Sequence, residues 1–219
     1  MNLRMPPVVL NLILLNVIVY IVTHFLAPGL QQYFVLFYPT PHGLFQPYQL
    51  ITYMFGHETF LHIFLNMLAL WMLGSQVEMV WGGKKFLFFY IVCGLGAAGF
   101  NLLIYYIKLQ TNQDPAVYAS LQNFYSFLPP MLGASGSVFG ILAAFGMLFP
   151  NQMLMMLFPP IPMKAKYFVI LYGAIELFSG ISNNSGDNVA HFAHIGGLIT
   201  GLIMLLIWRQ LGSLYSRVE

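Results

Sequence analysis

The chain has 219 residues, of which 59% are hydrophobic and 6% are charged, and its formal net charge is +2. A soluble domain carries roughly 25% charged residues, so this composition excludes a water-soluble globular surface. The basic residues are spread through short connectors and form no patch, which gives no indication of nucleic-acid binding. Cys93 is the single cysteine, so neither an internal disulfide nor a cysteine metal cluster can form.

Apolar runs of about 20 residues recur along the chain, the length that a helix needs to cross about 30 Å of hydrocarbon. The first run is longer than the apolar core of a secretion signal and no small-x-small cleavage site follows it, so we interpret it as a retained helix. The predicted spans, in chain order, are residues 8–26, 60–79, 86–107, 133–149, 166–182 and 191–208, with approximate boundaries.

The segments between the spans are connectors, and the two long ones cover residues 27–59 and 108–132. Both are rich in Pro, Gln, Tyr and Phe, a composition typical of loops in the membrane interface. The sequence shows no internal repeat, interdomain linker or low-complexity tract. The prediction is therefore a single membrane-embedded domain over residues 1–219, folded as an all-α bundle of six transmembrane helices.

Basic residues mark the cytoplasmic side of a multi-pass membrane protein. Six spans place seven of the eight basic residues on one face of the membrane, and only Lys108 on the other. The seven are Arg4, Lys84, Lys85, Lys164, Lys166, Arg209 and Arg217. We therefore expect both termini in the cytoplasm, and the short tails suggest a bacterial inner membrane.

Polar side chains inside a span cost a few kcal/mol, so each of them is a functional hypothesis. His62 and Asn66 lie near the start of the second span, and Ser135 lies near the start of the fourth. His191 and His194 begin the sixth span. These three spans begin on the face opposite the lysines, so we expect the polar groups to reach a similar depth, where water could enter from outside.

Small residues on the fourth and sixth spans predict that these two helices pack backbone to backbone. The two ladders are Gly136-x-x-x-Gly140 and Gly197-x-x-x-Gly201. Such packing would bring Ser135 within hydrogen-bond reach of a histidine of the sixth span. That is the geometry that nucleophilic catalysis requires.

Three motifs together resemble the rhomboid family of intramembrane serine proteases. They are His62-x-x-x-Asn66, Gly133-Ala134-Ser135-Gly136 and Ala193-His194-x-Gly196-Gly197-x-x-x-Gly201. Residues 46–55, Glu78 and Gly82 are similar to the same family. Each motif alone is weak evidence for the family. The motifs occur in the family's order and on the matching spans over about residues 45–205, so the set as a whole is specific to it.

The resemblance implies a rhomboid-like bundle and a serine endopeptidase that cleaves transmembrane helices of membrane proteins near the outer membrane face. Its partners would be transmembrane substrates and the lipid bilayer, with no cofactor, metal or nucleic acid. By similarity, Ser135 is the nucleophile and His194 its base, and no carboxylate is needed as a third member. His62 and Asn66, with the backbone N–H of Ser135, are the family's candidates for stabilising the oxyanion.

The resemblance also implies how the histidine is held, which is by packing. In the family a ring one turn after the serine, often a tyrosine, stacks on the histidine, and Phe139 occupies that position here. Gly136 and Gly197 belong to the packing elements beside the two reactive residues. Glu176, the acidic residue inside the fifth span, matches no motif, and we expect it to make a buried hydrogen bond.

Several alternatives stay open at this point. Ser135 could be a small packing residue whose hydroxyl binds its own backbone, which is also our interpretation of Ser137. His62 and Asn66 could form an interhelical hydrogen-bond pair, and His191 a structural or water-bridging group. For the whole chain, the alternative functions are a non-catalytic rhomboid-like protein that binds transmembrane helices and a small transporter.

Overall fold

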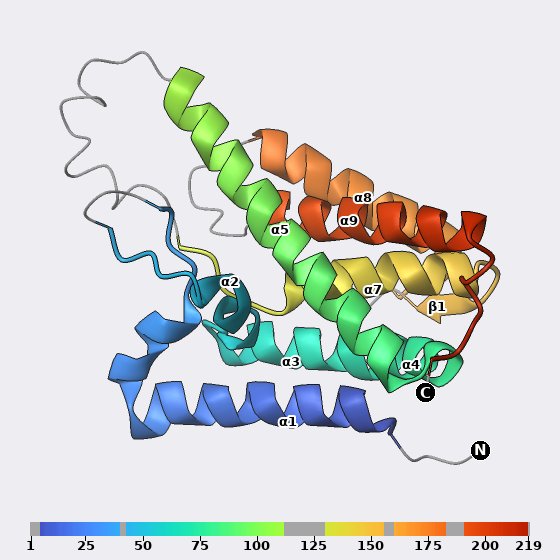
Figure 1. Cartoon of the computed structure of the whole chain (residues 1–219), viewed down its shortest axis with the longest axis horizontal. Helices are drawn as coiled ribbons and strands as arrows, with labels where there is room; N and C mark the ends of the chain where they lie inside the picture. The colour runs from blue at the N-terminus through green and yellow to red at the C-terminus, as the bar shows by residue number, and fades with distance from the viewer. Residues whose placement is uncertain (1–4, 40–42, 112–129, 156–159, 183–190, 219) are drawn as a thin grey trace.

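The structure is a computed structural model that describes residues 5–39, 43–111, 130–155, 160–182 and 191–218. It is a bundle of helices that run roughly along one direction, except for the longest helix, which crosses the others obliquely (Figure 1). The long helices are α1 (Pro7–Ile21), α3 (Phe60–Ala69), α4 (Ser75–Trp81), α5 (Gly83–Thr111), α7 (Ser135–Leu148), α8 (Ala165–Ser182) and α9 (His191–Gln210). Shorter helical segments are the π-helical turns Val22–Leu26 and Leu70–Gly74, the 3-10 turns Pro28–Phe34 and Tyr53–Phe55, and α2 (Gln49–Thr52).

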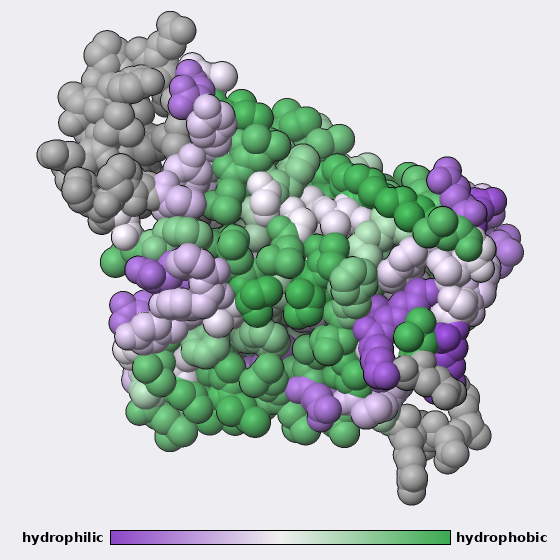
Figure 2. Space-filling view, viewed as in Figure 1, coloured by the Kyte–Doolittle hydropathy of each residue, from purple (hydrophilic) through white to green (hydrophobic). Residues whose placement is uncertain are grey.

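Each of the six predicted spans coincides with helix. Four described segments are long and apolar enough to cross a membrane, namely Pro7–Leu26, Phe60–Trp81, Gly83–Ile107 and His191–Gln210. Helix α7 is apolar but shorter, and α8 is not among the four, so the count of six transmembrane helices stays a prediction. Figure 2 shows hydrophobic side chains covering the flank of the bundle, as lipid contact requires.

Two features of the fold differ from the predictions, namely the end of one helix and the presence of a small sheet. Helix α5 continues to Thr111, so Lys108 belongs to this helix and not to a connector. The connector between α7 and α8 contains a small antiparallel sheet of β1 (Met153–Met155) and β2 (Pro162–Lys164), an exception to the all-α prediction. Strands of three residues are too short for an alternating pattern to reveal them in the sequence.

Helix α7 lies at the centre of the bundle and is buried on nearly all sides, because it is apolar around its whole circumference. It packs against α5, α8 and α9. A Cβ on Gly197 would overlap with the carbonyl group of Gly136, and a Cβ on Gly201 would lie 3.0 Å from the Cα of Gly140. The predicted backbone-to-backbone approach of the two glycine ladders is therefore confirmed.

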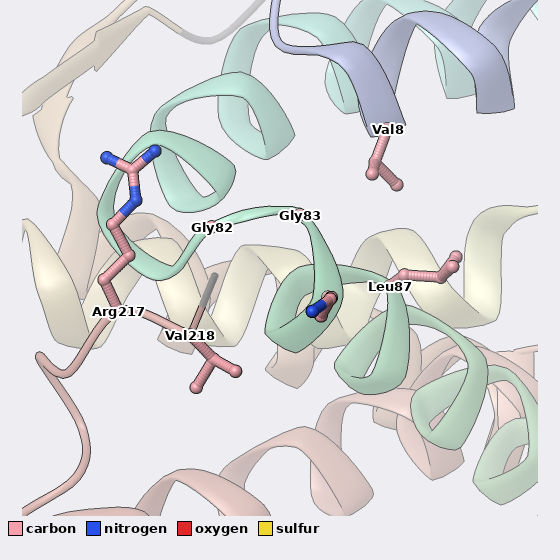
Figure 3. A pocket seen from close by; sticks show the side chains of 7 residues that line it. Val8, Gly82, Gly83, Leu87, Arg217 and Val218 are labelled. Atoms are coloured by element: carbon pink, nitrogen blue, oxygen red, sulfur yellow. The ribbon is translucent and has the colours of Figure 1, made fainter.

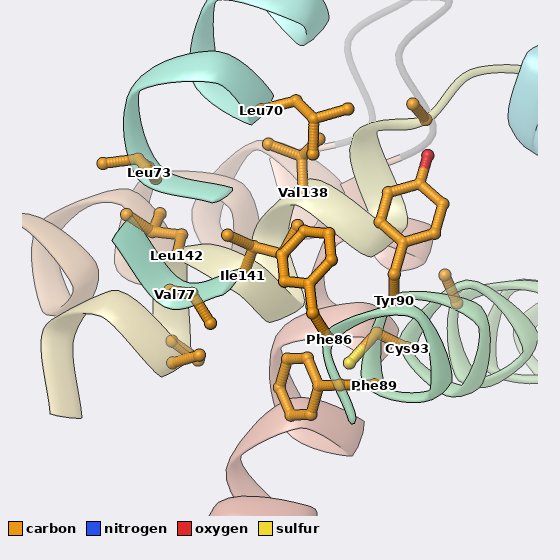
Figure 4. Close-up of a cluster of buried hydrophobic side chains, with 14 of the residues drawn as sticks. Leu70, Leu73, Val77, Phe86, Phe89, Tyr90, Cys93, Val138, Ile141 and Leu142 are labelled. Atoms are coloured by element: carbon orange, nitrogen blue, oxygen red, sulfur yellow. The ribbon is translucent and has the colours of Figure 1, made fainter. Parts of the chain in front are cut away.

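Large apolar side chains fill the space on the other side of α7. Figure 4 shows Leu70 and Val77, from the segment that contains α4, interleaved with Phe86 and Phe89 of α5 and with Ile141 of α7. All five are buried. This core fixes the depth and rotation of α7, and hence the position of its first residue, Ser135.

The start of α1, the junction of α4 and α5, and the chain's C-terminal residues meet at one end of the bundle (Figure 1). The carboxylate of Glu78 accepts hydrogen bonds from the backbone N–H groups of Val8 (3.0 Å) and Val9 (2.8 Å), which lie in the first turn of α1. Lys85 donates to the carbonyl of Ser216 (3.0 Å). This end carries the basic residues of the second predicted connector and of the C-terminal tail, in agreement with the predicted sidedness, while Arg4 lies outside the described residues.

Candidate active site

Ser135 is the first residue of α7, and the segment before it is held by the first connector. Met131 forms an isolated antiparallel bridge with Leu36, and the backbone N–H of Gly133 donates to the carbonyl of Tyr53 at 2.9 Å. Gly133 has φ +126°, a conformation that other residues rarely adopt. The chain therefore enters α7 along a defined path that places the Ser135 hydroxyl at the helix start.

The structure brings Ser135 and His194 into direct contact. The distance between Ser135 Oγ and His194 Nε2 is 2.7 Å, which is a hydrogen bond between the serine hydroxyl and the imidazole. The contact follows from the close packing of α7 on α9 through Gly136 and Gly197. The His194 side chain is only 12% exposed, so the pair is largely shielded from the surroundings of the bundle.

Phe139 lies one turn after Ser135 on the same face of α7. Its ring stacks on the imidazole of His194, with the centroids 4.5 Å apart and an angle of 8° between the planes. Phenylalanine supplies a ring face without a hydroxyl group. The stack restricts rotation of the imidazole about its own axis.

Glu176 contacts His194 from the side opposite to Ser135. Its Oε2 atom lies 2.9 Å from His194 Nδ1 and 2.6 Å from His191 Nδ1. The expected hydrogen bond of Glu176 is present, between its Oε2 atom and His191 Nδ1, and it is part-buried. A carboxylate from α8 therefore touches the His194 ring beside Phe139, a contact that the sequence analysis did not predict.

The sequence carried a signal for this contact that the motif analysis missed. In Gly173-x-x-Glu176-x-x-x-Gly180 the three named residues lie on one face of the helix, with a small residue on each side of the acid. On α9, His191, His194 and Leu198 share a face in the same way. Two faces of this kind on neighbouring antiparallel helices favour a carboxylate–imidazole contact.

His62 borders the same space as Ser135. A Cβ placed on Gly133 would lie 2.7 Å from His62 Nε2 and 3.6 Å from Ser135 Oγ. Helix α3, which carries His62, begins at a cap in which the Thr59 hydroxyl accepts from the His62 backbone N–H at 3.1 Å. The His62 ring and the Ser135 hydroxyl therefore face the same space beside Gly133.

Asn66 is buried one turn further along α3. One N–H of its carboxamide donates to the His62 carbonyl at 2.9 Å, a bond within one helix and not the interhelical pair considered above. A carboxamide nitrogen has two hydrogens, so this bond uses only half of its donor capacity. Ser137, by contrast, is fully buried on another face, where its hydroxyl lies 3.8 Å from the sulfur of Met54.

His57 lies just before α3, with its ring 4.9 Å from that of His62. It is 1% exposed. Burial lowers the pKa of His57 from its ordinary value of 6.5 to about 3, with a smaller contribution from the positive charge that His62 would carry. The His57 ring is therefore neutral at physiological pH.

Glu176, His191 and His194 together offer one oxygen and two nitrogen atoms within 4.8 Å of one another, a set of the kind that binds zinc. Ligands of a tetrahedral zinc ion lie roughly 3.3 Å apart when their bonds are about 2.0 Å long. The 2.6 Å between Glu176 Oε2 and His191 Nδ1 is shorter than this and is a hydrogen-bond distance. In this structure Glu176 and His191 are joined by a hydrogen bond, and their two atoms are too close together to be ligands of one zinc ion.

A pocket of about 380 Å³ lies elsewhere, at the end of the bundle where the chain termini meet. Figure 3 shows Val8, Gly82, Gly83, Arg217 and Val218 around it. Gly83 begins α5, and Ala97, which faces Gly136 next to Ser135, lies roughly 21 Å further along this helix. The pocket is therefore separate from the Ser135–His194 pair.

Comparison with known proteins supports a family assignment. The family model described as Rhomboid domain matches residues 44–211. The chain is 30% identical over 149 residues to Rhomboid protein 1, mitochondrial, of Saccharomyces cerevisiae, which covers 68% of this chain and 38% of that protein. It is 29% identical over 163 residues to Rhomboid protease AarA of Providencia stuartii, and the aligned part is 69% of this chain and 52% of that protein.

A third relative is Rhomboid protease GluP of Bacillus subtilis, 29% identical over 160 residues, or 70% of this chain and 24% of that protein. The chain thus spans about half or less of the length of these relatives. The relatives come from mitochondria and from bacteria. With the family model matching most of the chain and four helices suited to spanning a bilayer, this chain is an integral membrane protein of the rhomboid family.

Proposed function

We propose that this chain is an intramembrane serine endopeptidase that uses Ser135 and His194 to cleave transmembrane helices of membrane proteins. The observation that carries the proposal is the 2.7 Å hydrogen bond between Ser135 Oγ and His194 Nε2. A serine hydroxyl is a weak nucleophile until an adjacent base can take its proton, and this geometry supplies the base. The names of two bacterial relatives, both rhomboid proteases, support the same reaction.

The reaction then proceeds in two stages. Ser135 Oγ attacks the carbonyl carbon of the scissile bond while its proton passes to His194 Nε2. The resulting oxyanion lies near His62 and the backbone N–H of Ser135, with Asn66 as a further donor on the same helix. His194 then protonates the leaving amine, and water hydrolyses the ester that remains on Ser135.

The site lies at the opposite end of the bundle from the basic α4–α5 junction, because α7 begins there and α3 enters from the same side. We place this end near the outer membrane face, and both termini on the cytoplasmic side or its equivalent. Substrate helices would be cut where small residues destabilise them near the membrane edge. The relatives are mitochondrial as well as bacterial, so the comparisons do not favour the bacterial inner membrane.

The test is cleavage of a fluorescently labelled single-pass membrane protein by the purified, detergent-solubilised chain. Ser135→Ala and His194→Ala should each abolish cleavage, whereas Ser137→Ala, which removes a buried hydroxyl on another face, should retain it. A serine-directed phosphonate should label the wild-type chain and not Ser135→Ala. Thermal unfolding in detergent checks that all variants are folded.

Cleavage that survives Ser135→Ala would show that the nucleophile is another residue. A wild-type chain that is folded, takes no phosphonate and cleaves no substrate would indicate the non-catalytic alternative. In that case, binding of the substrate helix without cleavage is the property to measure.

A further inference from the structure

The imidazole of His194 is held between two polar groups from different helices. Its Nε2 faces Ser135 on α7, and its Nδ1 faces Glu176 on α8, 2.9 Å from Oε2. The Glu176 side chain is 13% exposed, comparable to that of His194. A carboxylate in such surroundings is costly unless it is paired, and the two histidines are the partners that the structure gives it.

The packing of α8 on α9 explains why Glu176 stands there. A Cβ on Gly180 would lie 3.3 Å from His191 Cβ, and a Cβ on Gly173 would lie 3.0 Å from Leu198 Cδ2. These two glycines bring the backbones together on both sides of Glu176. The glutamate is therefore directed at α9 by the register of the two helices and not by a chance rotamer at the surface.

The two histidine contacts of Glu176 are not equivalent. His191 Nδ1 makes a hydrogen bond of 2.6 Å to Oε2, which is short and typical of a charge-assisted bond. The contact with His194 Nδ1 is close but does not have the direction of an in-line hydrogen bond. His191 thus holds the carboxylate in place, and the carboxylate acts on His194 mainly as a nearby negative charge.

We propose that Glu176 is a positioning residue for the Ser135–His194 pair, and that His191 fixes its carboxylate. This inference rests on the proposed function. A negative charge beside Nδ1 keeps the histidine proton on that nitrogen, so that Nε2 is free to accept the proton of Ser135. When the Ser135 O–H bond breaks and Oγ bonds to the substrate carbon, the proton goes to Nε2, and Glu176 stabilises the imidazolium without taking a proton itself.

The pH dependence of the reaction is set by the groups around His194. In the described part of the chain these are Glu176 on α8, His191 one turn earlier on α9, and His62 on α3. Helix α5 presents small residues and Phe100 to this part of α9, and α7 presents Ser135 and Phe139. Glu176 is the only acidic group in this set, so its removal should change the pH profile in one direction.

The experiment compares Glu176→Gln with the wild-type chain in the cleavage assay, as kcat and KM over a range of pH. We expect kcat to fall about 10- to 100-fold with KM within about twofold. In soluble triads the loss of the carboxylate costs about 10⁴ in kcat. A smaller effect is expected here because Phe139 still holds the ring and the carboxylate contact is not in line.

The pH profile provides a readout that a purely structural role would not change. Glu176 places a carboxylate 2.9 Å from His194 Nδ1, so its replacement by a neutral amide should change the pH profile of kcat in Glu176→Gln. Glu176→Asp keeps the charge and should recover part of kcat with an acid limb near that of the wild type. Lys84→Gln, which removes an exposed charge at the opposite end of the bundle, is the control and should leave both measurements unchanged.

The proposal is overturned if Glu176→Gln is folded and keeps wild-type kcat and pH profile while Ser135→Ala is inactive. Glu176 would then serve only to join α8 to His191. If Glu176→Gln does not fold, the variant His191→Gln tests the proposal instead. It removes the hydrogen bond that holds the Glu176 carboxylate and keeps the carboxylate itself. A three- to tenfold loss of kcat at unchanged KM supports the inference, and wild-type kcat contradicts it. Activity in Ser135→Ala would instead refute the proposed function itself.

Discussion

Phe139 lies parallel to His194, with an angle of 8° between the rings and 4.5 Å between their centroids. The two residues come from α7 and α9, whose backbones touch at Gly136 and Gly197. The stack fixes the plane of the imidazole, and this plane determines whether Nε2 is directed at the Ser135 hydroxyl. The stack therefore links the packing of α7 on α9 to the geometry of the hydrogen bond between Ser135 and His194.

Replacing Phe139 with alanine should lower kcat about tenfold, because the imidazole gains freedom and spends less time in the reactive orientation. KM should change little, because Phe139 acts through its contact with His194 and not through binding of the substrate. Phe139→Tyr keeps the ring face and should stay within about threefold of the wild type. The measurement is steady-state cleavage in detergent, and an alanine variant as active as the tyrosine variant would contradict the stacking argument.

His62→Ala and Asn66→Ala should each reduce kcat, by about 100-fold for a donor that meets the oxyanion directly. The physical reason is that such a donor is strongest when negative charge develops, so KM should be nearly constant. His62 should show the larger loss, because its Nε2 borders the space next to Ser135, whereas Asn66 already donates to the His62 carbonyl.

The control for both variants is thermal unfolding, since Asn66 is buried. If His62→Ala raises KM and leaves kcat unchanged, then His62 binds the ground-state substrate and does not stabilise the oxyanion.

Gly197→Ala should destabilise the chain by about 1–3 kcal/mol and abolish cleavage, because the added methyl group overlaps with the Gly136 carbonyl and pushes α9 away from α7. Gly99→Ala on α5 is the matched control, since no atom lies within 4 Å of its Cβ position. Alanine there should stabilise the helix by up to about 1 kcal/mol. Unfolding curves in detergent and the cleavage assay together test the pair, and equal effects at both glycines would refute the packing argument.

The buried, neutral ring of His57 predicts a loss of stability in acid. The unfolded chain takes up a proton at His57 below its ordinary pKa of 6.5, whereas the folded chain does so only near pH 3. Between these values the unfolded state binds more protons, so stability falls as the pH is lowered, by at most about 1.4 kcal/mol per pH unit from this group.

His57→Gln, similar in size and not titratable, should therefore show a flatter decline of the unfolding midpoint between pH 6.5 and pH 4 than the wild type. A parallel decline in both proteins would mean that His57 is protonated in the folded state or that another group dominates.

Much of the fold could be predicted, because apolar length and glycine spacing are local properties of the chain. The six predicted spans coincide with helices, and the ladder of Gly136 and Gly140 does meet that of Gly197 and Gly201. The sheet of residues 153–155 and 162–164 was not predicted, since its pairing joins two segments that carry no periodic signal. The end of α5 at Thr111 was also missed, because hydropathy falls before the helix ends.

Apolar length and composition were enough to predict from the sequence that the chain lies in lipid and that a serine, three histidines and an asparagine enter the bundle from the same side. The glycine spacing also predicted that α7 and α9 approach closely, because small residues let two backbones touch. The surroundings of His194, by contrast, depend on the tertiary structure. Glu176 reaches His194 only through the register of α8 on α9, a relation between two helices that no motif within either of them records.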